Sequence, residues 1–167
     1  MLYQKILIDL DNEEKLLNNS LSNYRQHSDS YHHIYNETIE KAIHDSTSLK
    51  YNLLRWHNIS ALIVTNKHQI AIAEISSNNI TELLNEKFNI EVLVLQANKS
   101  FNDYKNETLM PFFIRSDRLK SQYENVEFVQ LLSELRILTS WAILNSENLK
   151  KKNSEISIAI EQKLNTP

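Results

Sequence analysis

The sequence has no glycine and no cysteine. At average usage, a chain of 167 residues would contain about 12 glycines. Because glycine lets the backbone wrap closely around phosphate, its absence excludes the Walker A, dinucleotide-binding and kinase glycine loops. The absence of cysteine excludes disulfide frameworks, thiolate metal sites and cysteine nucleophiles. Backbone positions that need a positive φ are left to asparagine, which is abundant here.

A strong charge of either sign is also lacking, as is any long hydrophobic run. The net charge is −3, which gives no electrostatic argument for binding nucleic acid or a membrane surface. No apolar run approaches the roughly 18–20 residues that span a bilayer, and the apolar N-terminal patch lacks the small-residue cleavage site of a signal peptide. We therefore expect a cytoplasmic protein without a membrane partner. The bias toward Asn, Ile and Lys indicates an AT-rich genome. Separately, we expect a bacterial or phage protein.

The length and the 41% apolar content suit one folded domain. No linker rich in Pro, Gly or Ser interrupts the chain, and no internal repeat is visible. We predict a single α+β domain over residues 1–167. It would be helical over 11–57, carry a β-β-α-β core over 59–95, and be helical again over 116–164.

The predicted core is the only stretch in which β-type sequence dominates. Residues 59–65 and 69–75 predict two strands joined by a short turn, which is a hairpin. A short helix with Asn79 and Glu82 as its capping pair follows. The run Ile90–Leu95, apolar apart from Glu91, then predicts a central strand of a small mixed sheet.

Amphipathic helices are predicted on both sides of this core. Asp11 and Glu14 form a capping box that marks a helix start, and an apolar stripe continues from there to about Asp45. The polar residues 27–30 are a candidate break in that helix. The stripe is formed by Leu17, Leu21, Tyr24, Ser28, Tyr31, Tyr35, Thr38 and Ala42.

The C-terminal part is predicted as two further helices. Residues 96–109 are polar and predict a loop. Residues 123–145 carry the clearest helical face in the chain, and a last helix is predicted at about 154–164.

The order hairpin, helix, strand resembles, in outline, the core of the PD-(D/E)xK nucleases. The matching tripeptide is Glu74-Ile75-Ser76, with Ser76 where that family has lysine, and residues 59–65 contain no acidic residue. The resemblance implies a degenerate nuclease-like domain associated with nucleic acid. Glu74 would be its remaining ligand for a divalent metal such as Mg²⁺.

A second candidate metal site lies on the first long helix. Asp29, His33, Glu37, Glu40 and His44 are spaced 4, 4, 3 and 4 residues apart and so share one helical face. His33, Glu37 and His44 are the candidate ligands for Zn²⁺ or Mn²⁺. The alternative is a solvated polar face opposite the apolar stripe. We expect no cofactor other than such a metal.

No nucleophile and base can be paired from the sequence, so no catalytic residue is predicted. Tyr24, Tyr31 and Tyr35 are candidate partner-binding residues, because tyrosine is enriched at protein interfaces. Their partial burial inside the domain is the alternative. The expected function is that of a non-enzymatic protein-interaction or regulatory domain, such as an inhibitor, an immunity protein or an assembly factor of a bacterial or mobile-element system. The partner would be another protein, with nucleic acid as the alternative.

Overall fold

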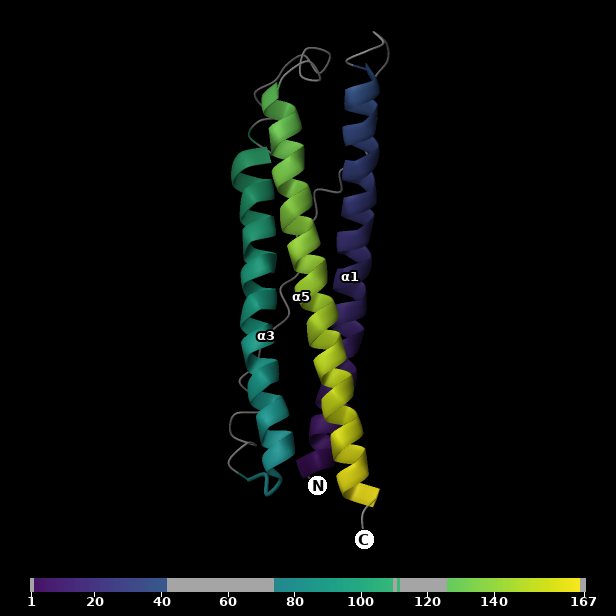
Figure 1. Ribbon diagram of the computed structural model, residues 1–167, viewed down its shortest axis with the longest axis vertical. Helices are drawn as coiled ribbons and strands as arrows, with labels where there is room; N and C mark the ends of the chain where they lie inside the picture. The colour runs from purple at the N-terminus through teal and green to yellow at the C-terminus, as the bar shows by residue number, and fades with distance from the viewer. Residues whose placement is uncertain (1, 42–73, 110, 112–125, 166–167) are drawn as a thin grey trace.

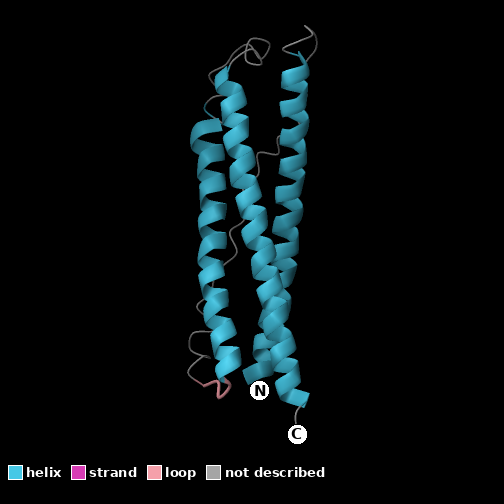
Figure 2. Ribbon diagram, viewed as in Figure 1, coloured by secondary structure: helices cyan, strands magenta, loops and turns pink. Residues whose placement is uncertain are grey.

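The computed structural model describes residues 2–41, 74–109, 111 and 126–165. In this described part, 96% of the residues are helical and no strand is present (Figure 2). The predicted α+β class with a mixed sheet is therefore wrong. The elements are α1 (Leu2–Lys41), α3 (Asn78–Asp103), the π-helix η2 (Tyr104–Leu109) and α5 (Val126–Asn165).

The helices pack lengthwise into a long bundle (Figure 1). α1 and α3 run in the same direction, and α5 runs in the opposite direction and packs against both. Side-chain hydrogen bonds from Lys87 to Glu13 and from Asn98 to Tyr24 each join residues 74 apart in sequence. A constant offset is the mark of parallel helices that keep one alignment. The two 40-residue helices are each about 60 Å long at 1.5 Å per residue.

The buried positions follow a heptad repeat. From Ile80 to Phe101 on α3 most of them alternate between steps of four and three residues, and α5 shows the same alternation from Leu132 to Ile160. This spacing places one seam of each helix toward its neighbours, as in a left-handed coiled coil. In the π-helix η2 the steps to Lys105 and Leu109 are both four residues. The seam residues on α3 and η2 are Ile80, Leu84, Lys87, Glu91, Val94, Asn98, Phe101 and Lys105. Those on α5 are Leu132, Leu135, Thr139, Ala142, Ser146, Leu149, Asn153, Ile156 and Ile160.

The apolar core consists of three clusters along the bundle, and each takes side chains from all three helices. The cluster near the two chain ends contains Ile6, Leu10, Ile80, Leu84, Ile156 and Ile160. The middle cluster contains Leu17, Val94 and Leu149. The far cluster includes Tyr24, Tyr31, Phe101, Leu132 and Leu135. Each fully buried aliphatic side chain contributes roughly 1.5–3 kcal/mol.

The predicted central strand Ile90–Leu95 lies inside α3 instead. Glu91 and Val94 face the core, whereas Val92 and Leu93 are each 42% exposed. That pattern has the three-to-four-residue period of a helix and not the two-residue period of a strand. Residues 96–103 continue α3 and 104–109 form η2, so the loop predicted over 96–109 is also wrong.

The N-terminal helix starts earlier than predicted and has no break. α1 begins at Leu2, and Asp11 lies within it, where its carboxylate pairs with Lys15 at 2.7 Å. Across the expected break, the Ser30 hydroxyl donates a hydrogen bond to the Gln26 carbonyl oxygen at 2.7 Å. A serine that bonds back to the preceding turn is accommodated in a continuous helix.

Two further boundaries differ from prediction. The N-cap of α3 is Ser77, whose carbonyl accepts the Thr81 amide at 3.0 Å, so the cap lies before the expected Asn79. The two predicted C-terminal helices are one helix, α5. The predicted hairpin falls mostly on residues 59–73, outside the described residues, and the described residues 74–77 contain no strand.

Candidate functional site

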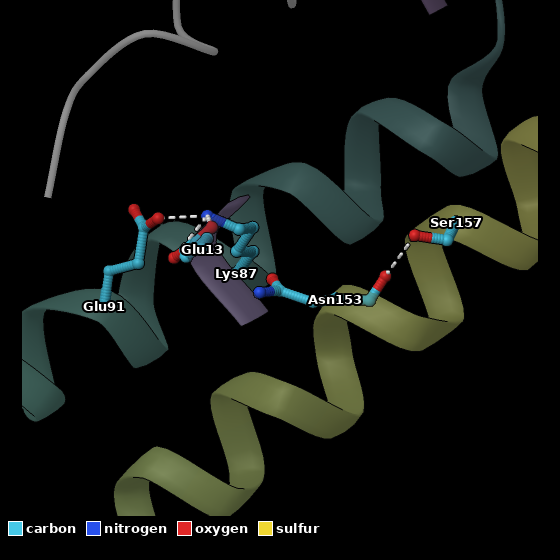
Figure 3. Close-up of polar contacts among 5 residues, drawn as sticks. All are labelled: Glu13, Lys87, Glu91, Asn153 and Ser157. Carbon is cyan, nitrogen blue, oxygen red and sulfur yellow. Dashed lines mark hydrogen bonds and ion pairs between the residues drawn. The ribbon is translucent and has the colours of Figure 1, made fainter. Parts of the chain in front are cut away.

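A polar layer interrupts the apolar core between the first and middle clusters. It is formed by Glu13 from α1, Lys87 and Glu91 from α3, and Asn153 from α5 (Figure 3). Lys87 lies one heptad after Ile80 and one heptad before Val94, so it occupies a position that is apolar in the neighbouring layers. All three helices therefore contribute to this one polar level.

Lys87 connects the layer electrostatically. Its side chain is only 2% exposed, and its Nζ lies 2.9 and 3.2 Å from the two carboxylate oxygens of Glu13. The same ammonium also donates to the carboxylate of Glu91. Burial raises the pKa of Glu91 above its ordinary value, although the charge of Lys87 acts to lower it. The layer therefore joins the helices through charge-assisted hydrogen bonds at the expense of desolvating three ionisable groups.

Asn153 completes the layer from α5. Its side chain reaches toward Lys87 (Figure 3), and its amide nitrogen and oxygen are buried without a hydrogen-bond partner. Its backbone carbonyl accepts the Ser157 hydroxyl at 3.0 Å. A buried unsatisfied amide costs roughly 1–3 kcal/mol, so this residue does not stabilise the bundle simply by being buried.

A second group of buried polar side chains lies in the far cluster. The Tyr24 hydroxyl accepts a hydrogen bond from the Asn98 amide at 2.8 Å. The hydroxyl of Tyr31 and Nδ1 of His27 are 3.1 Å apart. The ring of Phe101 makes edge contacts with Tyr24 at 5.3 Å and with His27 at 5.5 Å between ring centres. The hydrogen bond from Asn98 to Tyr24 and the ring contacts of Phe101 join α1 to α3, whereas the contact between His27 and Tyr31 lies within α1.

Lys105 is the most unusual ionisable group of this region. It lies in η2 and is 1% exposed, with its Nζ 5.6 Å from the centre of the Phe101 ring. Burial lowers its pKa to about 8. Single π-helical turns are frequent at functional sites, but the side chain is enclosed by the core and is not presented to solvent. Its position fits a structural role within the bundle.

The partner-binding tyrosines predicted from the sequence lie in different environments. Tyr24 and Tyr31 are each 2% exposed and belong to the core, which was the alternative considered for them. They offer no surface to a partner in this bundle. Tyr35 lies within α1, but its side chain is outside the described part.

The candidate metal ligands are not brought together in what the structure describes. His33 and Glu37 lie on α1 with side chains outside the described part, and His44 is outside the described residues altogether. Among the side chains that are described, no three His, Asp or Glu residues are close enough to hold a metal ion.

The nuclease-like resemblance loses its structural basis. Its last strand, Ile90–Leu95, is helical. Glu74 is exposed in a turn just before α3, and Ser76 is also exposed. Neither residue lies on the strand of a hairpin, where the resemblance would require them.

The outer surface of α5 carries an apolar strip that sequence reasoning missed. Ile137 is 68% exposed and Leu144 is 56% exposed, with the half-buried Trp141 between them at the spacing i, i+4, i+7. We call these three residues the outer strip. Beside it is a hollow of about 520 Å³ lined by Gln130, Ser133, Glu134, Ile137 and Leu138. The heptad frame of α5 is the signal that separates these outward residues from the core.

A larger surface groove of about 640 Å³ lies between α1 and α5 and is polar. Arg25 and Glu147 pair across it at 2.7 Å. Lys150 lies 2.9 Å from the Asn18 side-chain oxygen and 3.4 Å from Glu14. Exposed pairs of this kind contribute roughly 0–1 kcal/mol, so the groove is a solvated contact between two helices.

Comparison with known proteins adds no relative. The chain matches no family model, no curated protein and no solved structure. None of the described helices is both long and apolar enough to cross a membrane.

Proposed function

We propose that this protein is a non-enzymatic, cytoplasmic protein-interaction domain whose outer strip binds an amphipathic helix of another protein. The carrying observation is the exposure of large apolar side chains on the outside of α5, at 68% for Ile137 and 56% for Leu144. Isolated exposed apolar residues are ordinary on a protein surface, whereas a strip at helical spacing is a feature of a binding surface.

The geometry of the strip favours a helix as the ligand. Anchors at i, i+4 and i+7 match the spacing with which one helix packs along another. Trp141 lies at the centre, and tryptophan is among the residues that dominate binding energies at interfaces. The hollow beside Ile137 is suited to one apolar side chain of the partner. The carboxylate of Glu134 on its rim favours a basic residue next to that anchor.

The buried polar groups support a non-enzymatic role. In the polar layer and around Tyr24 they make contacts between helices, and they are enclosed by the core. A catalytic acid or base must reach its substrate within hydrogen-bond distance, which buried inter-helix contacts do not allow without opening the bundle.

A site-specific photo-crosslinker tests this proposal. Placed at Ile137, it is expected to capture a single different protein in the native host, and the double variant Glu134→Lys, Leu144→Glu with the crosslinker still at Ile137 is expected to lose that product. The matched control is a crosslinker at Lys99, which is 79% exposed on α3 and should capture nothing specific. Circular dichroism should show unchanged helix content in the double variant.

Two results would count against the proposal. A product between two copies of this chain would identify self-association instead of a different partner. Equal products from Ile137 and Lys99 would mean that the strip has no specific ligand.

A further inference from the structure

The polar layer lies at one level of an otherwise repetitive bundle. Heptad seams present similar apolar surfaces at every repeat, so two such helices can slide by one heptad and still bury apolar side chains. One heptad corresponds to a translation of about 10 Å. Something in the core must therefore distinguish the observed alignment from the shifted ones.

The ion pair between α1 and α3 makes that distinction in the polar layer, and the hydrogen bond from Asn98 to Tyr24 is a second, uncharged contact at the same offset. Glu91 travels with Lys87, because both are on α3, so the contact that depends on alignment is the one from Lys87 to Glu13. Shifting α3 by one heptad in one direction would bring Lys87 to the level of Ile6, among the apolar side chains of the first cluster. Glu13 would then face Val94 and lose its ion pair with Lys87.

The shift in the other direction is disfavoured for the same reason. Ile80 would come level with Glu13, and the partly buried Glu13 carboxylate would again lose Lys87. Breaking a buried pair leaves an uncompensated charge, which is far more destabilising than never having had the pair. Asn153 extends the distinction to α5, because only the observed alignment places its buried amide in a polar layer.

We propose that the polar layer of Glu13, Lys87, Glu91 and Asn153 is a register lock, which holds the three helices in one alignment although an apolar layer would make the bundle more stable. Its buried charges and the unsatisfied Asn153 amide are the cost of that specificity. The raised pKa of Glu91 agrees with this view, since the folded bundle favours the neutral form of that group. The inference does not depend on any partner.

The test is a distance measurement between α1 and α3. Because the chain has no cysteine, Lys15→Cys and Lys99→Cys introduce the only two sites for nitroxide labels, and both native side chains are well exposed. Pulsed electron-spin resonance on the otherwise unchanged protein should give one narrow distance. The variant with Leu at all four layer positions should melt at a higher temperature and show additional distances from helices shifted by a heptad.

Two further variants make the result decisive. Thr139→Val also removes a buried polar group from the seam, but the Thr139 hydroxyl bonds to Leu135 of its own helix, so a single distance should persist. The reversed layer Glu13→Lys, Lys87→Glu, Glu91→Lys keeps opposite charges paired and should also keep one distance. If the apolar variant fails to fold, the reversed-layer variant still tests the proposal, because several distances in that variant would overturn it. A single unchanged distance in the apolar variant would overturn it as well.

Discussion

At the scale of single residues, buried ionisable side chains are the chief peculiarity of this bundle. Lys87 and Lys105 are 2% and 1% exposed, whereas lysine is almost never fully buried unless it is paired. Lys87 lies between two carboxylates, and Lys105 lies over an aromatic ring. Of the two, Lys105 gives a prediction about how stability depends on pH.

Lys105 is expected to make the bundle more stable as the solution becomes alkaline. Its pKa is lowered to about 8 from an ordinary 10.5, so between these values the unfolded chain binds more protons than the folded one. Stability rises with pH under that condition, by about 2 kcal/mol from pH 7.5 to 9.5. Denaturant unfolding at several pH values measures the rise.

The matched variants for this prediction are Lys105→Met and Lys99→Met. The first should flatten the rise and be more stable than the natural protein at pH 7.5, and the second, at an exposed site, should leave the profile unchanged. Above about pH 10 stability should fall in all three proteins, because burial raises the pKa of Tyr24 and Tyr31 and the unfolded chain then loses protons first. A flat natural profile between pH 7.5 and 9.5 would contradict the prediction.

At the scale of elements, the composition of Ile90–Leu95 explains why its sequence predicts a strand although it lies in α3. Ile90–Leu95 is apolar on nearly every side, because Val92 and Leu93 add exposed apolar surface to the buried Val94. The heptad repeat of α3 is also hard to see in the sequence, because several of its buried positions are polar. These positions are Lys87, Glu91, Asn98 and Lys105. Polar residues inside and apolar residues outside together weaken the periodic signal.

The helical assignment of this run predicts unequal effects for two neighbouring valines. Val94→Ala removes methyl groups from the middle cluster and should lower the free energy of unfolding by roughly 1–3 kcal/mol. Val92→Ala, at a position 42% exposed, should change it by less than about 0.5 kcal/mol. Chemical denaturation compares them. Since residues 92 and 94 would share one face of a strand, similar losses at both would favour the strand.

At the scale of the whole molecule, the bundle is long, with some charged side chains buried in its interior and some apolar side chains exposed on its surface. Helices about 60 Å long produce a rod, whereas a globular chain of this length has a radius of gyration of roughly 15 Å. The polar layer lies inside, between apolar clusters, and the outer strip of apolar side chains lies on the surface of α5. Under the two proposals above, the outer strip of α5 binds another helix while the polar layer in the interior holds the alignment.

Small-angle scattering tests the overall shape directly. The radius of gyration should be well above the roughly 15 Å of a globular chain, with a maximum dimension of at least about 60 Å. The measurement should be made at concentrations where the scattered intensity gives the mass of one 19.6 kDa chain. A value near 15 Å for that species would be incompatible with the extended bundle.

Much of the element content was predictable, but the way the elements assemble was not. The stripe of the first helix correctly contained Leu17, Leu21, Tyr24 and Tyr31, all of which are buried. The helical face after residue 126 was also correct, because Leu132, Leu135 and Ala142 recur at a clean helical period. The candidate metal ligands are harder to predict than the helices. His33, Glu37 and Glu74 are candidates because of their residue type and local spacing, which do not show whether they come together in space.

Residue composition and periodicity were enough to exclude certain kinds of site and to locate the strongest helices. Lacking glycine and cysteine, the protein has no glycine phosphate loop and no thiolate chemistry, and amphipathic periodicity marks much of α1 and α5. Only the tertiary structure decided that Lys87 and Glu91 are core residues and that Ile137 and Leu144 are surface residues. Burial depends on which helix faces which, and Lys87 is accommodated in the core because Glu13 of α1 and Glu91 of α3 both supply carboxylates there.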